Sequence, residues 1–86
     1  MHPTIEPQFS PERFRDLRQQ RQLKPNQLAY LAGLTETQVY RLERGERPNL
    51  YAVTLARIAL VLGTTSEYLL GLTDDPSPIA TVETSP

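Results

Sequence analysis

The sequence predicts a compact, all-α domain of five short helices. Apolar residues recur at helical spacing, most clearly in Leu55, Ile58, Ala59 and Leu62, which follow the i, i+3, i+4, i+7 pattern of a core-facing helix. Residues that favour helix starts and helix ends separate these apolar stretches. With 86 residues, of which 38% are hydrophobic, the chain can bury one small core.

The first two helices are expected over residues 11–21 and 25–32. Ser10 is placed to cap the first helix, and Pro11 takes the first helical position, where a missing N–H costs nothing. Gly33 ends the second helix, because a residue without a Cβ enters the left-handed region without steric cost. The chain is therefore expected to turn sharply after the second helix.

A third helix is expected over residues 36–44 and completes a pair of crossing helices. Thr35 is its expected N-cap, with Gln38 three residues later as the capping-box partner, and Gly45 closes it. Ala29 lies where the second and third helices would cross, and its small side chain lets their axes approach. The two helices and the turn between them therefore predict a helix-turn-helix.

Two more helices and two tails complete the prediction. The fourth helix is expected over residues 52–62, and the fifth begins after Thr65 and stops at Gly71. Residues 1–8 and 73–86 are rich in proline and polar residues and show little periodicity, so we expect two flexible tails.

The segment from Pro25 to Gly45, PNQLAYLAGLTETQVYRLERG, and the following ERPN resemble the helix-turn-helix of the Cro and phage-repressor (XRE) family of bacterial regulators. The resemblance covers residues 9–72 and implies a lambda-repressor-like fold. It also implies a sequence-specific regulator of transcription that binds double-stranded DNA, with repression through an operator as the expected effect.

In this family the third helix lies in the major groove. The resemblance thereby nominates five base-contacting residues, namely Glu36, Thr37, Gln38, Tyr40 and Arg41. Arg41 is the first choice, because a guanidinium can bond guanine O6 and N7 together; the alternative is a solvated surface arginine. Glu36 either accepts from cytosine or stabilises the positive end of its helix, and Gln38 either contacts a base or caps the helix.

Phosphate contacts are expected at the start of the second helix and around the end of the third, from Lys24, Asn26, Gln27, Arg44, Arg47 and Asn49. Three residues depart from the family pattern. Lys24 replaces the usual serine or threonine cap, and Pro25 removes one N–H donor. Gln22 stands where a glycine is common, so either a non-glycine residue is held at positive φ or the turn differs.

The resemblance also implies an internal ion pair between Arg18 and Glu43, which we interpret as structural. On the fourth helix, Val53, Ala56 and Leu60 form a second apolar stripe beside the core stripe. It is either a wider core face or the interface of a homodimer that would place two recognition helices on a palindromic site.

The net charge of −1 conceals an uneven distribution. Residues 11–60 hold all nine basic residues and five acids, which gives +4, and the remainder holds five acids and no bases. A mildly basic body is compatible with binding to the DNA backbone.

Other classes of function have little support. The single histidine, His2, lies in a tail, and the chain has no cysteine and no glycine-rich phosphate loop, so we expect no enzyme, no metal and no cofactor. No signal or membrane segment is recognisable, which favours the cytoplasm. The alternative function is an antitoxin or adaptor that mainly binds a protein partner.

Overall fold

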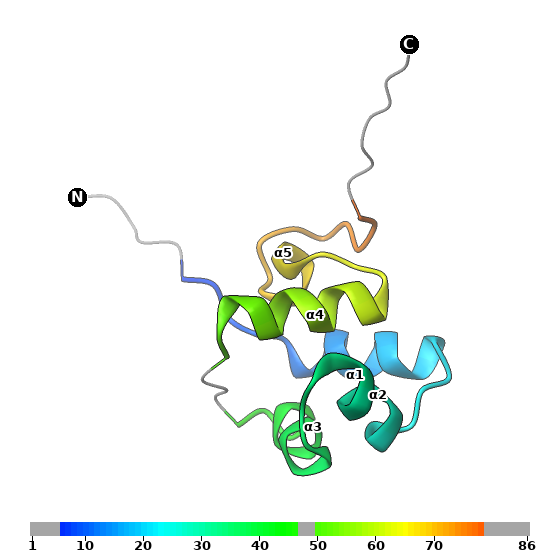
Figure 1. Cartoon of the computed structure of the whole chain (residues 1–86). Helices are drawn as coiled ribbons and strands as arrows, with labels where there is room; N and C mark the ends of the chain where they lie inside the picture. Colours follow the sequence, from blue (N-terminus) through cyan, green and yellow to red (C-terminus); the bar gives the residue numbers. More distant parts are fainter. Residues whose placement is uncertain (1–5, 47–49, 79–86) are drawn as a thin grey trace, which may run out of the picture.

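The computed structural model describes residues 6–46 and 50–78, and Figure 1 shows its helices. In chain order they are α1 (Pro11–Gln20), α2 (Pro25–Ala32), α3 (Glu36–Glu43), α4 (Ala52–Leu62) and α5 (Ser66–Leu69). The described part of the chain contains no strand, and the predicted five-helix, all-α, lambda-repressor-like fold is confirmed. α1 and α3 each end one residue earlier than expected, because Arg21 and Arg44 are their C-caps. α5, expected to stop at Gly71, ends at Leu69 because Leu70 is its C-cap.

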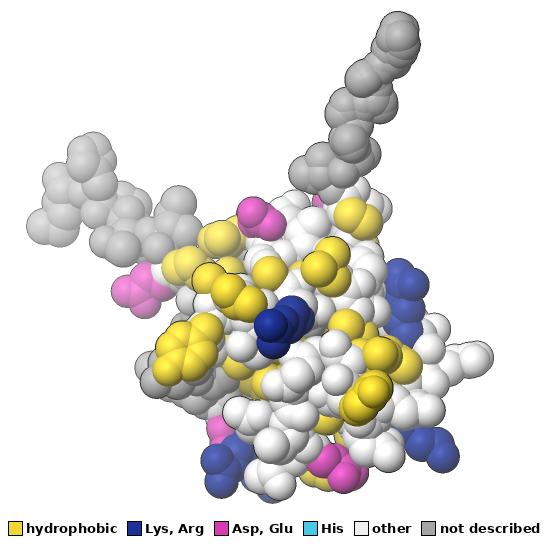
Figure 2. All heavy atoms as spheres, in the orientation of Figure 1, with side chains coloured by type: hydrophobic (Ala, Val, Ile, Leu, Met, Phe, Trp, Pro, Cys, Tyr) yellow, Lys and Arg dark blue, Asp and Glu magenta, His cyan; other side chains and the backbone are white. Residues whose placement is uncertain are grey.

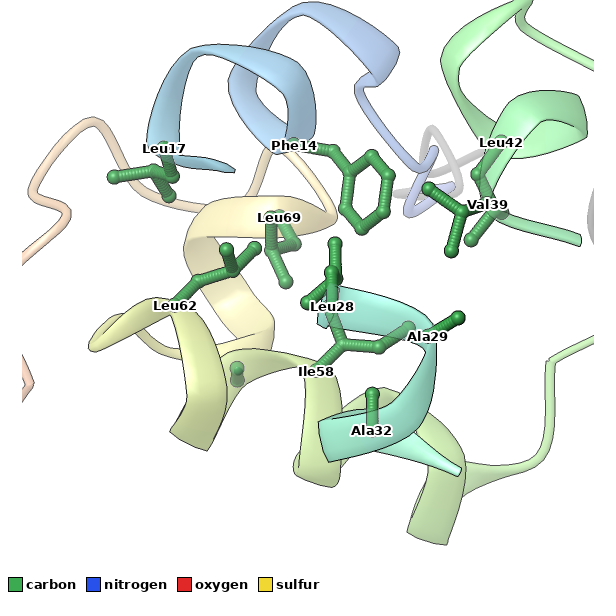
Figure 3. Packing of buried hydrophobic residues seen from close by; sticks show 11 residues of the cluster. Phe14, Leu17, Leu28, Ala29, Ala32, Val39, Leu42, Ile58, Leu62 and Leu69 are labelled. Atoms are coloured by element: carbon green, nitrogen blue, oxygen red, sulfur yellow. The ribbon is translucent and has the colours of Figure 1, made fainter. Parts of the chain in front are cut away.

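One apolar core joins all five helices. In Figure 3 the Phe14 ring of α1 points into the middle of the cluster, towards side chains of α2, α3 and α5. Ala29 and Ala32 are buried on α2, which packs closely against both α3 and α4. These methyl-sized side chains let α2 lie against both neighbours, as close packing requires. The buried apolar residues are Phe14, Leu17, Leu28, Ala29, Ala32, Val39, Leu42, Ile58, Ala59, Leu62 and Leu69.

The turn between α2 and α3 depends on Gly33. Its φ is +73°, in the left-handed region that favours glycine. A Cβ at Gly33 would also lie only 3.0 Å from Nη1 of Arg57, which reaches over from α4. Thr35 then starts α3 with the predicted capping box: Gln38 N–H donates to Thr35 Oγ1 (3.1 Å), and Thr35 N–H donates to Gln38 Oε1 (2.8 Å). The orientation of α3 relative to α2 therefore follows from local sequence.

The turn after α1 uses a residue other than glycine at positive φ. Gln22 has a φ of +58°, so a non-glycine residue is held at positive φ here, which is the first of the two alternatives that the sequence left open. Its N–H donates to the carbonyl of Gln19 (2.9 Å), and the N–H of Leu23 donates to the carbonyl of Arg18 (3.1 Å). These two bonds form a Schellman ending for α1 with glutamine where glycine is preferred.

Residues 73–77, called here the C-terminal strap, lie against the domain. Arg13 Nη1 donates to the carbonyls of Tyr68 and Thr73 (2.7 Å each), and its Nη2 donates to Asp74 (2.9 Å). The Thr64 hydroxyl, which is buried, donates to the carbonyl of Pro76 (2.6 Å). The sequence predicts a flexible tail over residues 73–86. Within that range the structure holds the C-terminal strap against the domain, and residues 79–86 lie outside the described residues.

The N-terminal segment also contacts the domain where it is described. Gln8 N–H donates to the carbonyl of Leu70 (3.0 Å), and Ser10 N–H donates to that of Leu69 (2.8 Å). Phe9 packs on the core with its ring centroid 5.4 Å from that of Phe14. The flexible tail predicted over residues 1–8 remains a prediction, since residues 1–5 are not described.

Candidate nucleic-acid interface

α3 buries Val39 and Leu42 in the core, so the side chains on its outer face are polar and exposed. The five residues nominated for base contact all lie on the exposed part of the helix, namely Glu36, Thr37, Gln38, Tyr40 and Arg41. The short helix thus presents a row of donors and acceptors on a rigid scaffold, which is the arrangement that reading base edges requires.

Two of these side chains are bonded to each other. Tyr40 Oη donates a hydrogen bond to Glu36 Oε2 (3.1 Å) one helical turn away. This bond and the negative charge of Glu36 raise the pKa of Tyr40 above its usual value of 10.0. The hydrogen bond thus joins the Tyr40 hydroxyl to the Glu36 carboxylate on the exposed face of α3.

Gln38 is used as a structural residue. Its Oε1 accepts from the backbone of Thr35, so the capping alternative is realised in the structure. Gln27 plays the same part at α2, where its Oε1 accepts from the backbone N–H of Lys24 (2.8 Å). Sequence reasoning missed this second role because Lys24 is not a capping residue; the signal was a glutamine at the third helical position.

The nominated phosphate contacts divide into two groups. Lys24, Asn26 and Gln27 are exposed at the start of α2, and Arg44 is exposed after α3, where its Nη2 donates to Glu46 (2.9 Å). The other two nominated residues, Arg47 and Asn49, lie outside the described residues.

Arg18 and Glu43 form an ion pair between α1 and the end of α3. The Arg18 Nε donates to Glu43 Oε2, and its Nη2 lies 3.3 Å from Oε1, so the contact has two bonds. The two side chains are only 12% and 13% exposed. A further bond from Arg18 Nη1 to the carbonyl of Leu23 (2.7 Å) extends the contact to the chain before α2. The pair is part of the scaffold behind α3.

A second surface lies on α4. Val53 is 61% exposed, Leu60 is 80% exposed, and Ala56 between them is exposed as well. In Figure 2 hydrophobic side chains gather over α4, with a basic side chain among them. The wider-core alternative does not hold for these three residues, because the core uses the opposite side of the helix, with Ile58 and Leu62.

Two other kinds of site, a membrane-spanning helix and a metal centre, are absent from the described residues. No helix among them is long and apolar enough to cross a bilayer. Over residues 6–46 and 50–78, no group of three or more histidine, cysteine, aspartate or glutamate side chains could hold a metal ion.

Solved structures share this fold. The hydroxypropylphosphonic acid epoxidase from S. wedmorenis superposes with a TM-score of 0.64 and 38% identity, over 70% of this chain and 31% of its own. Fe(II) HppE in complex with substrate gives the same TM-score and identity, over 34% of its chain. A chain of the SinR protein/SinI protein complex also has a TM-score of 0.64, with 23% identity and coverage of 70% and 58%, which shows the fold.

This chain therefore spans about a third of the epoxidase structures and little more than half of the chain from the SinR/SinI complex. No curated protein matches it. A family model for a helix-turn-helix domain matches residues 12–70, which hold almost all of the five helices. The sequence motif, the fold and this match agree: the chain belongs to the helix-turn-helix domain family, as its resemblance to Cro and phage repressors predicted.

Proposed function

We propose that this protein is a sequence-specific regulator of transcription that binds double-stranded DNA and represses by occupying an operator. The observation that carries the proposal is the exposed polar face of α3, fixed by the capping box at Thr35 and by the core residues beneath it. Membership of the helix-turn-helix family supports DNA binding, since such domains place the second helix of the pair in the major groove. The proposal places the protein in the cytoplasm, as its resemblance to the Cro and phage-repressor family implies.

Within this proposal the residues of α3 have different roles. Arg41 reads guanine through its guanidinium, and Thr37 contacts a thymine methyl group. Glu36 accepts from cytosine, with the Tyr40 hydroxyl holding its carboxylate in place. Gln38 keeps its capping bond to Thr35 and so serves base contact only with its amide nitrogen.

Phosphate contacts hold the domain in position on the duplex. Lys24 and Asn26 supply them at the start of α2, with Gln27 beside them, and Arg44 supplies one after α3. The proposal includes Arg47 and Asn49, which lie three and five residues after Arg44 in the sequence.

We also propose that two copies bind together through the α4 stripe of Val53, Ala56 and Leu60. A two-fold axis through this stripe would give a palindromic operator with half-sites about 34 Å apart. The exposure of these three apolar side chains supports the interface.

The test is binding to the region upstream of the protein's own gene. Arg41→Ala should reduce the preference for this duplex over a random one by about 5-fold or more, because a bidentate guanine contact is worth about 1–3 kcal/mol. Arg15→Ala is the matched control, since it removes the same charge from an exposed position on α1. Circular dichroism verifies that all variants are folded. Failure of the folded wild type to prefer the upstream duplex at any salt concentration contradicts the proposal.

A protein-binding function, as an antitoxin or adaptor, is the second candidate. The observation that favours it is the 38% identity to structures of an epoxidase. The matched region is about a third of that longer chain, so the same fold also occurs as one part of an enzyme. The α4 stripe would then hold a protein partner. The salt series separates the two functions, because several phosphate contacts make DNA affinity fall steeply with salt, whereas an adaptor binds little DNA at any salt. We propose no catalytic role for this chain.

A further inference from the structure

Glu46 lies among the residues assigned to DNA and contacts two of them. Its Oε1 is 3.7 Å from Arg41 Nε, and its Oε2 accepts from Arg44 Nη2 (2.9 Å). About half of the Glu46 side chain is exposed, and so is somewhat more than half of each arginine. A carboxylate in this place is unexpected, since it would be repelled by the phosphates that these arginines attract.

The backbone fixes the position of Glu46. Its N–H donates to the carbonyl of Arg41 (3.1 Å), and the N–H of Gly45 donates to that of Leu42 (3.2 Å). Gly45 has a φ of +82°, so the two bonds form a Schellman ending for α3 with Glu46 as the residue just beyond the glycine. The helix ending thus fixes the backbone of Glu46 just beyond α3, and from there its carboxylate lies 3.7 Å from Arg41 Nε.

The Glu46 carboxylate cancels one positive charge on the α3 face, taken here as residues 36–46. Residues 36–46 carry two arginines and three glutamates. Glu43 is neutralised by Arg18 behind the helix. The remaining groups, Arg41 and Arg44 against Glu36 and Glu46, sum to zero. Without the Glu46 carboxylate the same face would carry a charge of +1, and its attraction for any DNA would rise.

The contact with Arg41 leaves its base-reading atoms free. Glu46 approaches Nε, and among the described residues nothing is bonded to the two terminal nitrogens, which a bidentate contact with guanine would use. Arg44, by contrast, is bonded through one of its terminal nitrogens. We propose that Glu46 is a specificity-determining residue, which positions Arg41 for base contact and restrains Arg44 from binding phosphate on random DNA. This inference rests on the proposed DNA-binding function.

The experiment compares wild type with Glu46→Gln on the upstream duplex and on a random duplex across a salt series. Glutamine keeps the backbone bonds of the Schellman ending but removes the charge. We expect affinity for random DNA to rise about 3- to 10-fold at low salt and the slope of log K against log salt to steepen by about one, the value for one added phosphate contact. The ratio of upstream to random affinity should fall.

Two further variants locate the effect. Glu67→Gln removes the same charge from an exposed position on α5, so it separates net charge from position. In an Arg44→Gln background, Glu46→Gln should no longer steepen the slope, because the arginine to be released is gone. Circular dichroism verifies folding in each case.

Equal effects of Glu46→Gln and Glu67→Gln on random DNA overturn the inference, and so does an unchanged salt slope in Glu46→Gln. Failure of the proposed function has a different result, namely that the wild-type protein binds the upstream duplex no better than random DNA. Even then, the slope of log K against log salt on random DNA shows whether Glu46 restrains Arg44.

Discussion

At the scale of single residues, Gln22 holds a conformation that its side chain disfavours. A φ of +58° costs an L-residue about 1–2 kcal/mol in the folded state, and glycine avoids that cost. Glycine also has a higher conformational entropy in the unfolded chain, which lowers the stability of the folded state by about 0.5–1 kcal/mol. Gln22→Gly should therefore stabilise the domain by about 0.5–1 kcal/mol, measured by urea unfolding. Gln20→Gly, at the right-handed end of α1, is the control and should destabilise. A lower stability of Gln22→Gly than of wild type would contradict the assignment.

The sequence resolved some residue roles and left others open. For Gln38 the sequence indicated a capping role, because it lies three positions after a threonine, but left base contact as the alternative; the structure contains both bonds of the capping box. The φ of Gln22 was one of two alternatives, because a missing glycine indicates either strain or another turn. Glu46 was not recognised as a partner of Arg41, since that contact depends on how α3 ends in three dimensions.

At the scale of elements, the Arg18–Glu43 pair joins α1 to α3. Arg18→Met should leave a largely buried carboxylate without its partner and destabilise the domain by about 3 kcal/mol or more. Adding Glu43→Leu to Arg18→Met should restore much of that loss, because no unpaired charge remains. Urea unfolding of the single and double variants measures both effects. If the double variant is less stable than Arg18→Met, the pair has a different role.

The C-terminal strap is the second connection between elements, and Thr64 holds one end of it. Thr64→Val keeps the shape of the side chain but removes the donor to the carbonyl of Pro76, so we expect a loss of about 1 kcal/mol in the free energy of unfolding. Thr54→Val, on a half-buried threonine of α4, is the control for the change in side-chain chemistry. Equal stabilities of the two variants would show that the bond to the strap contributes nothing.

Helix ends could be predicted where a glycine is itself the C-cap. α2 and α4 have the expected bounds, since Gly33 and Gly63 stop them in the left-handed conformation. α1 and α3 end one residue early because right-handed arginines are their C-caps. The strap could not be predicted, because it has no periodicity and depends on Arg13, about 60 residues away in the chain.

At the scale of the whole molecule, the surfaces assigned to DNA and to the strap are separated. In Figure 1, α3 lies at the bottom of the domain, and α5 and the strap lie at the top, with α4 between them. The strap therefore leaves the outer face of α3 uncovered. Of the basic residues that the structure describes, Lys24, Arg41 and Arg44 are exposed on the surface assigned to DNA, whereas Arg13 holds the strap.

The homodimer is the prediction that belongs to this scale. A stable interface buries about 800 Å² on each partner, more than three side chains of α4 supply, so we expect weak association that depends on protein concentration. If two α4 helices pair antiparallel about Ala56, Val53 of one copy meets Leu60 of the other, and the small alanine lets the axes approach. Val53→Glu with Leu60→Glu would then place like charges at both contacts and should leave only monomer.

Light scattering over a range of concentrations measures the mass of wild type and of the double variant. Tyr30→Glu is the control: it puts one glutamate on an apolar residue that is 86% exposed on α2, outside the α4 stripe, and should keep the mass of wild type. The double variant should also lose cooperative binding to the upstream duplex while it keeps the helical circular dichroism spectrum. If its mass equals that of wild type at every concentration, the α4 stripe is not the dimer interface, and a palindromic operator would need another contact between the two copies.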